Sequence, residues 1–312
     1  MLDVLAITGP IYLIIAIGYA ASRRRIFAAD ELRVLGRFVL AFALPALLFN
    51  ALAQREVRDI LDGGYVAAYA GGALVIVLGA YAWQRFVRGR DAPTSAFVGM
   101  GMGFPNLAFV GYPIVLQFLG PPAAVALGLS LLVDNLLVLP LVLALAESGA
   151  GGGRRWHRVL AHSLGRVAFN PIVLAIVAGF AVAFAGVRLP QPITRSIDLF
   201  AQASTAVALF VIGGTLVGLE VRSLARDVIA IALGKLVAHP LAVAGILALL
   251  PRVDPTLRIA CIAFAAMPMV SVYPILAQRY RLEGLCAAAL LVTTVASFVT
   301  INVALWLLGT TR

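Results

Sequence analysis

Long apolar runs alternate with short polar gaps along the chain, and this pattern predicts membrane-spanning helices. Each run is roughly 18–25 residues long, the length of helix needed to cross ~30 Å of hydrocarbon. The charged residues gather in the gaps between the runs. The ten expected helices cover about residues 4–21, 35–52, 64–83, 94–120, 123–146, 170–187, 197–219, 228–250, 257–277 and 285–308.

Two of the ten runs are interrupted by proline near their middles and then share the tripeptide Tyr-Pro-Ile. The fourth run is broken at Phe104-Pro105-Asn106 and again at Tyr112-Pro113-Ile114. The ninth run is broken at Met267-Pro268-Met269 and again at Tyr273-Pro274-Ile275. Prolines can simply kink packed membrane helices. Interruptions at matching places in two halves, however, indicate the binding site of a secondary transporter.

The two halves of the chain align with each other at an offset of 161 residues. Pro10 aligns with Pro171, Gly18 aligns with Gly179, and the two Tyr-Pro-Ile tripeptides also align. Each half holds five runs, and an odd number of spans inserts the second half upside down relative to the first. We therefore predict an all-α membrane protein built as an inverted repeat of five plus five helices. Its parts are a first repeat at 1–146, a cytoplasmic linker at 147–169 and a second repeat at 170–312.

Composition excludes the class of ordinary soluble proteins. Hydrophobic residues make up 62% of the chain and charged residues 12%, whereas about 25% charged residues is usual in soluble domains. The basic pI of 10.4 does not indicate a nucleic-acid partner, because the arginines are not interleaved with aromatic residues on a polar face. Cys261 and Cys286 lie within apolar runs and are expected to be packed thiols. We predict no metal site and no cofactor.

The placement of arginine predicts the orientation of the helices. If the amino terminus lies outside, the inside gaps hold sixteen arginines, and the outside gaps with the carboxy terminus hold seven. Basic residues favour cytoplasmic loops, so we expect a multi-pass protein with both termini outside. The linker begins with a glycine-rich stretch, which predicts flexibility. Its basic continuation predicts a short helix at the membrane surface.

Both proline breaks fall near the middle of their runs, and hence near the centre of the bilayer. Unpaired backbone is tolerated there only inside protein or beside a watery cavity. Half-helices that meet at this depth direct N–H groups and positive dipole ends toward one spot, which suits an anion such as a carboxylate. Unwound carbonyl groups could instead coordinate a cation. Asn106 is the polar side chain best placed at the first break.

Other polar side chains could line the same cavity. Asn50 and Ser271 are candidates for substrate contact, although a hydrogen bond between helices is the simpler interpretation for a hydroxyl group. Tyr112 either gates the cavity or packs. The substrate-site residues that we predict are Asn106, Pro105, Tyr112, Pro268, Ser271 and Asn50.

A second set of candidates carries charge within the apolar runs. Lys235 is the single lysine among 23 arginines, and unlike arginine it can lose its proton when it is desolvated. Its alternative is to extend its ammonium to the inner interface. Asp134 and Asn135 lie near the centre of the fifth run, where a carboxylate indicates function. We predict that Asp134 and Lys235 approach each other as a charge pair, with His239 on the face of Lys235.

These residues resemble the auxin efflux carrier family, most closely its bacterial branch of malonate or malate permeases. The resemblance covers essentially the whole chain, and its most specific element is the stretch from Asn106 to Pro113. It rests further on Asp134-Asn135, on Lys235 with His239-Pro240, on Ala266-Met267-Pro268 and on Gln278-Arg279-Tyr280.

The resemblance implies a fold like that of sodium/bile-acid symporters and sodium/proton antiporters, with helices 4 and 9 broken and crossing. It implies an organic-anion site framed by Asn106 and Pro105. The second half departs from this pattern, because Met269 follows Pro268 and leaves Ser271 as the substitute polar group. Helices 3–5 and 8–10 would form the moving transport domain, and helices 1, 2, 6 and 7 a dimerising scaffold.

The resulting prediction is a carrier of a small organic anion, such as a dicarboxylate, in the bacterial inner membrane. Its expected partners are the anion, a proton or a sodium ion, the lipid bilayer and a second copy of the chain. A monovalent cation/proton antiporter is the second functional hypothesis. Such carriers use paired carboxylates, and only Asp134 is available here. A membrane receptor is the third functional hypothesis. We predict no enzyme, because intramembrane protease and hydrolase motifs are absent from the sequence.

Overall fold

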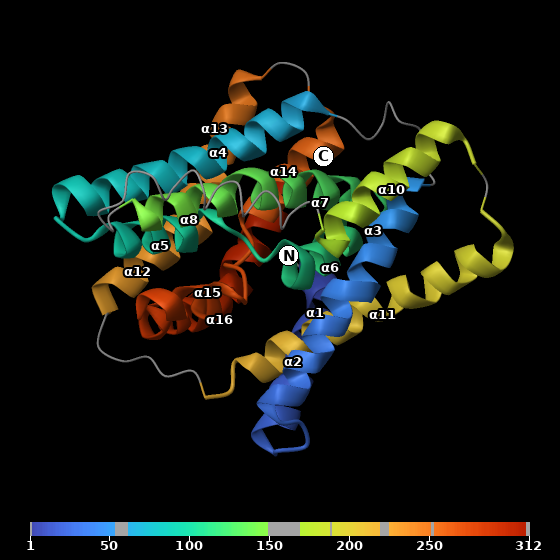
Figure 1. Cartoon of the computed structure of the whole chain (residues 1–312), viewed down its shortest axis with the longest axis horizontal. Helices are drawn as coiled ribbons and strands as arrows, with labels where there is room; N and C mark the ends of the chain where they lie inside the picture. Colours follow the sequence, from blue (N-terminus) through green and yellow to red (C-terminus); the bar gives the residue numbers. More distant parts are fainter. Residues whose placement is uncertain are drawn as a thin grey trace. The chain divides into compact units, whose positions relative to one another are not determined.

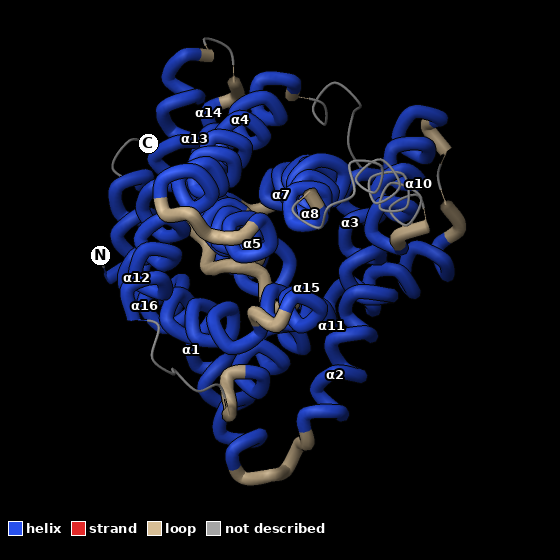
Figure 2. Tube along the Cα trace, turned by 60° about the vertical axis from the view of Figure 1, so that its left-hand side comes forward, coloured by secondary structure: helices blue, strands red, loops and turns tan. Residues whose placement is uncertain are grey.

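The computed structural model describes residues 2–53, 62–148, 169–187, 189–218, 225–250 and 253–309, and their regular structure is helical (Figure 1; Figure 2). The predicted linker helix falls outside these residues. In the first half the helices are α1 (Leu2–Arg23), α2 (Ala29–Phe38), η1 (Val39–Ala43), α3 (Leu44–Ala53), α4 (Gly63–Ala82), η3 (Trp83–Val87), α5 (Ala92–Gly103), η4 (Leu107–Gly111), α6 (Tyr112–Leu119), α7 (Pro122–Val133), η5 (Asp134–Val138) and α8 (Leu139–Glu147).

The second half is equally helical over its described residues. Its helices are α10 (Pro171–Ala185), α11 (Gln191–Thr215), α12 (Ala225–Leu233), η6 (Gly234–Ala238), α13 (His239–Leu249), α14 (Pro255–Ala265), α15 (Tyr273–Ala277), η7 (Gln278–Tyr280) and α16 (Glu283–Gly309).

Several of these helices join into longer rods that match the predicted apolar runs. Within the described residues, six rods are long and apolar enough to cross a membrane, and three shorter apolar helices accompany them. The long rods are 29–53, 63–87, 122–147, 191–215, 226–249 and 283–309, and the shorter helices are 107–119, 171–185 and 255–265. The predicted all-helical class is therefore confirmed. The number of ten spans stays a prediction.

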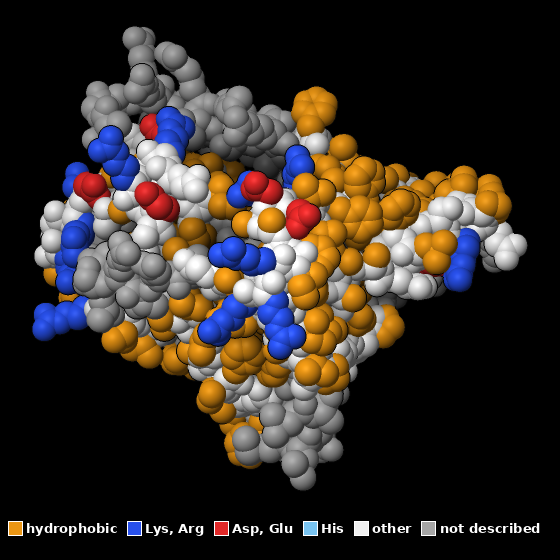
Figure 3. Space-filling model, turned by 90° about the horizontal axis from the view of Figure 1, so that it is seen from below, with side chains coloured by type: hydrophobic (Ala, Val, Ile, Leu, Met, Phe, Trp, Pro, Cys, Tyr) orange, Lys and Arg blue, Asp and Glu red, His pale blue; other side chains and the backbone are white. Residues whose placement is uncertain are grey.

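Large apolar side chains are exposed on the surface of these helices, as expected of a membrane protein. Phe184 is 82% exposed and Leu249 is 81% exposed. Hydrophobic side chains cover much of the face drawn in Figure 3, with charged side chains gathered in separate groups. Exposed apolar surface on this scale is rare on soluble monomers. In a bilayer the same side chains contact lipid.

The described residues fall into two compact units. Unit 1 draws on Met1–Asp62, Ala108–Leu129 and Ala168–Gly218, and unit 2 draws on Gly63–Leu107, Ser130–Val167 and Leu219–Arg312. Unit 1 thus contains α1, α2, α3, α6, α10, α11 and most of α7. Unit 2 contains α4, α5, α8 and the helices from α12 to α16.

Three of the long rods and one shorter helix contain a π-helical turn that ends two residues before a proline. The turns η1, η4, η5 and η6 are followed by Pro45, Pro113, Pro140 and Pro240. Proline lacks an N–H, and its ring clashes with the carbonyl group four residues earlier. A wider turn relieves this clash and leaves carbonyl groups without a backbone donor. Such π turns are frequent at functional sites, and here two of them hold Asp134 and Lys235.

Unit 1 is held together by helices whose backbones touch. A methyl group added to Gly18 of α1 would collide with the carbonyl oxygen of Phe210 on α11, and one added to Gly213 would collide with that of Ile15. On the other helix pair, a methyl group on Gly179 of α10 would lie 3.1 Å from the carbonyl oxygen of Phe49 on α3. Small residues allow this approach where lipid replaces water and van der Waals packing drives association.

Candidate functional site

The first proline break lies in unit 2 and separates α5 from η4. Asp91 starts α5 because its carboxylate accepts a hydrogen bond from the Thr94 amide at 2.9 Å, and the helix ends at Gly103 before the extended residue Phe104. Helical structure resumes at Leu107, directly after Asn106. The break therefore comprises Phe104, Pro105 and Asn106, as the sequence predicts.

The second break separates α14 from α15 and pairs with the first through the backbone. The Asn106 amide donates to the Pro268 carbonyl at 2.7 Å, and the Val270 amide donates to the Phe104 carbonyl at 3.2 Å. Pro105 and Met269 form an antiparallel bridge between these bonds. Buried backbone groups that lack a helical partner are costly. Each break thus supplies a hydrogen-bond partner to a backbone group of the other break.

Two polar side chains of the predicted site meet at this crossing of the breaks. The Asn106 Nδ2 amide donates to the Ser271 hydroxyl oxygen at 2.7 Å. Asn106 is buried, and Ser271 is partly exposed. The structure therefore brings together four predicted substrate residues, which are Asn106, Pro105, Pro268 and Ser271.

The two tyrosines of the repeated tripeptide occupy different environments. Tyr273 is fully buried in unit 2, where its hydroxyl donates to the Phe97 carbonyl at 2.6 Å. A methyl group added to Gly101 would approach this hydroxyl to 2.7 Å, so α5 needs a glycine there. Tyr112 belongs to unit 1 and lines a cavity. Tyr273 is therefore a packing residue, whereas Tyr112 faces a cavity.

Unit 1 contains a cavity of about 680 Å³ between α3, α6, α7 and α11. Its polar lining comes from Asn50, Tyr112, Gln202 and Thr205 among apolar side chains. The Asn50 amide donates to the Asp198 carboxylate at 2.6 Å. A volume of this size is within the range of small-molecule sites. The two remaining predicted substrate residues, Asn50 and Tyr112, therefore share one cavity.

Lys235 lies fully buried in unit 2 beside the second break. Its Nζ donates to the carbonyl oxygen of Ala265 at 2.7 Å and lies 2.9 Å from His239 Nδ1. Ala265 is the last residue of α14, and the final carbonyl groups of a helix lack intrahelical donors and carry partial negative charge. The prediction that His239 accompanies Lys235 is confirmed by this contact.

Asp134 is buried in the same unit and is contacted by a different residue than predicted. The Tyr69 hydroxyl lies 3.3 Å from each of its carboxylate oxygens. Asp134 and Lys235 attract each other electrostatically, as predicted, but no direct ion pair among the described residues joins them. The ammonium is bonded to Ala265 and His239 instead. Asn135 donates to the Leu131 carbonyl of its own helix at 2.8 Å.

Tyr65 and Tyr69 are polar site residues that sequence reasoning did not identify. Tyr65 shares a 2.6 Å hydrogen bond with Ser130, and the Tyr69 ring lies 6.4 Å from the His239 ring. Tyr69 therefore contacts Asp134 and His239 together. The signal was available, because two tyrosines four residues apart in an apolar run place two hydroxyl groups on one helix face.

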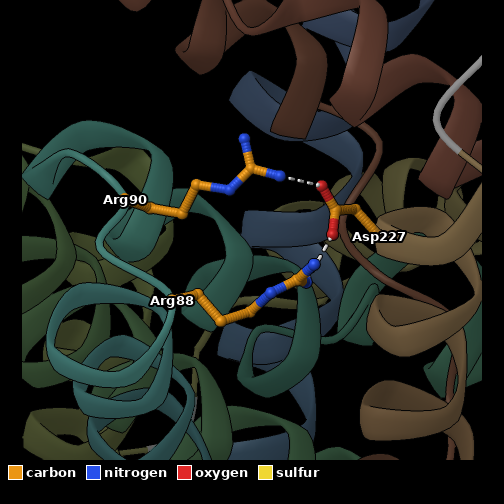
Figure 4. A network of polar contacts seen from close by, with 3 residues as sticks. All are labelled: Arg88, Arg90 and Asp227. Atoms are coloured by element: carbon orange, nitrogen blue, oxygen red, sulfur yellow. Dashed lines mark hydrogen bonds and ion pairs between the residues drawn. The ribbon is translucent and has the colours of Figure 1, made fainter.

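Two ionic clusters join the ends of helices in unit 2. Arg88 and Arg90 each bind one oxygen of the Asp227 carboxylate, at 2.8 and 3.0 Å (Figure 4). They link the segment after η3 to the first turn of α12, where an acidic residue is also favoured by the helix dipole. Sequence reasoning treated these arginines only as markers of orientation.

The second cluster is centred on Glu147 at the end of α8. Its carboxylate accepts a hydrogen bond from the Tyr280 hydroxyl at 2.9 Å and pairs with Arg279 at 3.1 Å. Burial, together with Glu147, raises the pKa of Tyr280 to about 12. The tyrosine thus keeps its proton and remains a donor at physiological pH.

Within the described residues, no group of three or more His, Cys, Asp or Glu side chains could hold a metal ion.

An all-helical chain with long apolar rods and two paired helix breaks has the architecture of a membrane transporter. Residues 6–306 match the model of a family described as "Membrane transport protein". The chain belongs to this family.

The relatives agree with this class. A protein of Rhizobium meliloti (strain 1021) named "Putative malonate transporter" is 27% identical over 313 residues, which cover 99% of this chain and 97% of the relative. The "Uncharacterized transporter YfdV" of Escherichia coli (strain K12) is 26% identical over 66% of this chain and 67% of its own length. "Auxin efflux carrier component 2" of Arabidopsis thaliana is 27% identical over 38% of this chain and 18% of its own length. The resemblance to the auxin efflux carrier family is confirmed.

Proposed function

We propose that this protein is a secondary transporter that moves a small organic anion across the cytoplasmic membrane of a bacterium. The observation that carries the proposal is the pairing of the two proline breaks through Asn106, Pro268 and Ser271. Membrane helices are interrupted in this way where a substrate binds. An anion that displaces the Ser271 hydroxyl would accept a hydrogen bond from the Asn106 side-chain amide in its place, which favours a negatively charged substrate.

An inverted repeat of five plus five helices is part of this proposal. The offset of 161 residues relates Gly18 to Gly179 and also Phe210 to Phe49. The close contact of Gly18 with the Phe210 carbonyl thus has a counterpart in the contact of Gly179 with the Phe49 carbonyl. Equivalent residues make equivalent contacts in both halves, which supports the repeat.

We assign the scaffold and the transport domain of the carrier to the two units. Unit 1 would form the scaffold and unit 2 most of the moving transport domain, because unit 2 gathers both breaks and the buried charges. Residues 108–129, which belong to the predicted transport helices 4 and 5, group with unit 1. A shift of unit 2 as a body would carry the crossing of the breaks from one side of the membrane to the other. This elevator-like motion provides alternating access. A homodimer through the scaffold is the expected assembly, and light scattering of the purified protein tests it.

The contacts between helix ends support the predicted assignment of these ends to two opposite sides of the membrane, and the arginine pattern supports which side is inside. The Arg88, Arg90 and Asp227 cluster joins two ends that the arginine pattern assigns to the inside. The Glu147, Arg279 and Tyr280 cluster likewise joins two inside ends. The Asn50–Asp198 bond joins two ends assigned to the outside. Both termini would then lie outside.

The proposed substrate is a dicarboxylate, and malonate is the first candidate because a full-length relative is named for it. The test is uptake of labelled organic acids into proteoliposomes that contain the purified chain. We expect saturable uptake of one small organic anion. Proton movement driven by sodium or potassium without any organic solute would instead support the cation/proton antiporter and would contradict this proposal.

A further inference from the structure

Lys235 lies beside the second break, and its ammonium group can lose its charge. Lys235 Nζ donates to the carbonyl oxygen of Ala265, and Pro268, three residues further along, accepts from the Asn106 amide. The lysine and the proposed anion site are thus joined by the short segment between α14 and the break. Lysine can lose its proton when it is desolvated, whereas arginine cannot.

The carboxylate of Asp134 attracts the ammonium of Lys235 through space, but no carboxylate among the described residues forms a direct ion pair with it. Its side chain is 0% exposed, and its partners are the Ala265 carbonyl and the His239 ring. An ammonium buried without a paired carboxylate is expensive. An anion that binds nearby would lower this cost, so anion binding and protonation of Lys235 should favour each other.

The ionisable groups of every packed element are consistent with this role. Asp134 of η5 and Tyr69 of α4 contact each other, and Cys261 lies one turn before Ala265 on α14. Asp227, earlier on the rod that carries Lys235, is already paired with two arginines. Helix α5 contains no ionisable side chain, and α16 contains Glu283 at its exposed first residue and the buried Cys286.

His239 supplies a second, independent sign of a mobile proton. Its Nδ1 contacts Lys235, while its buried Nε2 has no hydrogen-bond partner among the described residues. A buried ring nitrogen without a protein partner is costly. When Lys235 is protonated, Nδ1 must accept and Nε2 must carry the ring proton. The ring nitrogen Nδ1 is then the acceptor that faces the Nζ proton, at 2.9 Å.

We infer that Lys235 is the proton-binding site of the transporter and that one proton travels with each anion in the same direction. By linkage, a proton that strengthens anion binding is itself bound more tightly when the anion is present. The anion affinity should therefore be highest when Lys235 is protonated and should fall as the pH rises through its deprotonation. This inference rests on the proposed function and names its coupling ion.

The direct test measures proton uptake when malonate binds to the purified, full-length protein. Titration calorimetry in buffers with different ionisation enthalpies yields the number of protons taken up. Between about pH 7 and pH 9 malonate stays fully ionised, because both its carboxyl groups titrate in the acidic range, so any proton belongs to the protein. We expect uptake to rise with pH toward one proton for each anion. Binding without proton uptake over this range would overturn the inference but not the proposed function.

Variants assign the proton to its residue. Lys235→Met should weaken malonate binding at least about tenfold at the lower pH and remove proton uptake. Lys235→Arg, which stays charged, should retain binding but lose proton uptake and pH dependence. If Asp134→Asn removes proton uptake and Lys235→Met does not, the site is the carboxylate and our assignment is wrong. If malonate and a panel of other organic acids all fail to bind, the proposed function falls, and the inference falls with it.

Discussion

Several buried or half-buried polar side chains of this protein bond to backbone carbonyl groups. Lys235 binds Ala265, Tyr273 binds Phe97 and Asn135 binds Leu131. The Ala265 carbonyl lies at the end of α14, where no helical donor reaches it, and the lysine satisfies it. The same acceptors are available for a ligand or a proton carrier when a side chain releases them.

Asn106 is the residue on which the proposed anion site depends most. We expect Asn106→Ala to weaken malonate binding at least about tenfold, since it removes a buried donor worth about 1–3 kcal/mol. Asn106→Asp should weaken binding further, because it places negative charge beside the anion. Isothermal titration of the purified variants measures both effects.

Asn302 provides the matched control for this prediction. It lies in the same unit, and its amide donates to the Phe298 carbonyl of its own helix. Asn302→Ala should leave malonate affinity within about twofold, because the lost bond is local to the helix. Equal loss of affinity in the Asn106 and Asn302 variants would show that Asn106 acts through general stability rather than at the site.

The sequence indicated which polar residues matter more reliably than which residues they contact. Asn106, Ser271, Lys235, His239 and Asp134 were all candidates from their depth in the apolar runs. The carbonyl of Ala265 was not, because a backbone acceptor has no signature in the side-chain sequence. The sequence therefore predicted the attraction between Asp134 and Lys235, but not that the ammonium bonds directly to the Ala265 carbonyl.

At the scale of helices, proline placement carried information that hydropathy did not. The breaks at Pro105 and Pro268 were predicted from proline near the middle of an apolar run. The four π turns were not, because one extra residue in a turn barely shifts an apolar pattern with a period of 3.6 residues. Each of them precedes a proline by two residues, so proline spacing could have indicated them.

The contact between α1 and α11 yields a prediction about stability. Gly18→Ala should destabilise the folded protein by about 1–3 kcal/mol, because its methyl group would overlap the Phe210 carbonyl and force the helices apart. Thermal unfolding of the purified protein measures the change in Tm. Gly9→Ala on the same helix is the control, since that position faces open space. Indistinguishable Tm values for the two variants would contradict the close helix packing.

The Asp227 cluster yields a second prediction at this scale. Asp227→Asn removes the charge that holds both Arg88 and Arg90 and should lower the free energy of unfolding by about 1–3 kcal/mol. Asp30→Asn breaks only the exposed pair with Arg33 and should change stability by less than about 1 kcal/mol. Chemical denaturation compares the two variants. A larger effect at Asp30 would refute the structural role of Asp227.

At the scale of the whole molecule, the sequence predicted the class and the positions of most helices. Apolar runs of membrane-spanning length correspond to rods in the structure, and the family comparison confirms a membrane transport protein. The division into two units was not evident from apolar runs. Each unit gathers segments from both halves of the chain, and such long-range packing is invisible to local periodicity.

Alternating access predicts that one position at the breaks is reached from both sides of the membrane. Ser271 is partly exposed and bonds to Asn106, and the two native cysteines are buried and can be replaced. A single cysteine at Ser271 should react with an impermeant maleimide added on either side of sealed vesicles. Malonate should slow both reactions. Labelling from one side alone, under every condition, would contradict the proposed motion.

The proposed function requires that this chain carries an organic anion by itself. Counterflow tests it directly, with proteoliposomes loaded with unlabelled malonate and diluted into trace labelled malonate. A carrier predicts transient accumulation of label above its outside concentration, which excess outside malonate abolishes. Accumulation no greater than in protein-free vesicles, for malonate and for a panel of other small organic acids, would contradict the account.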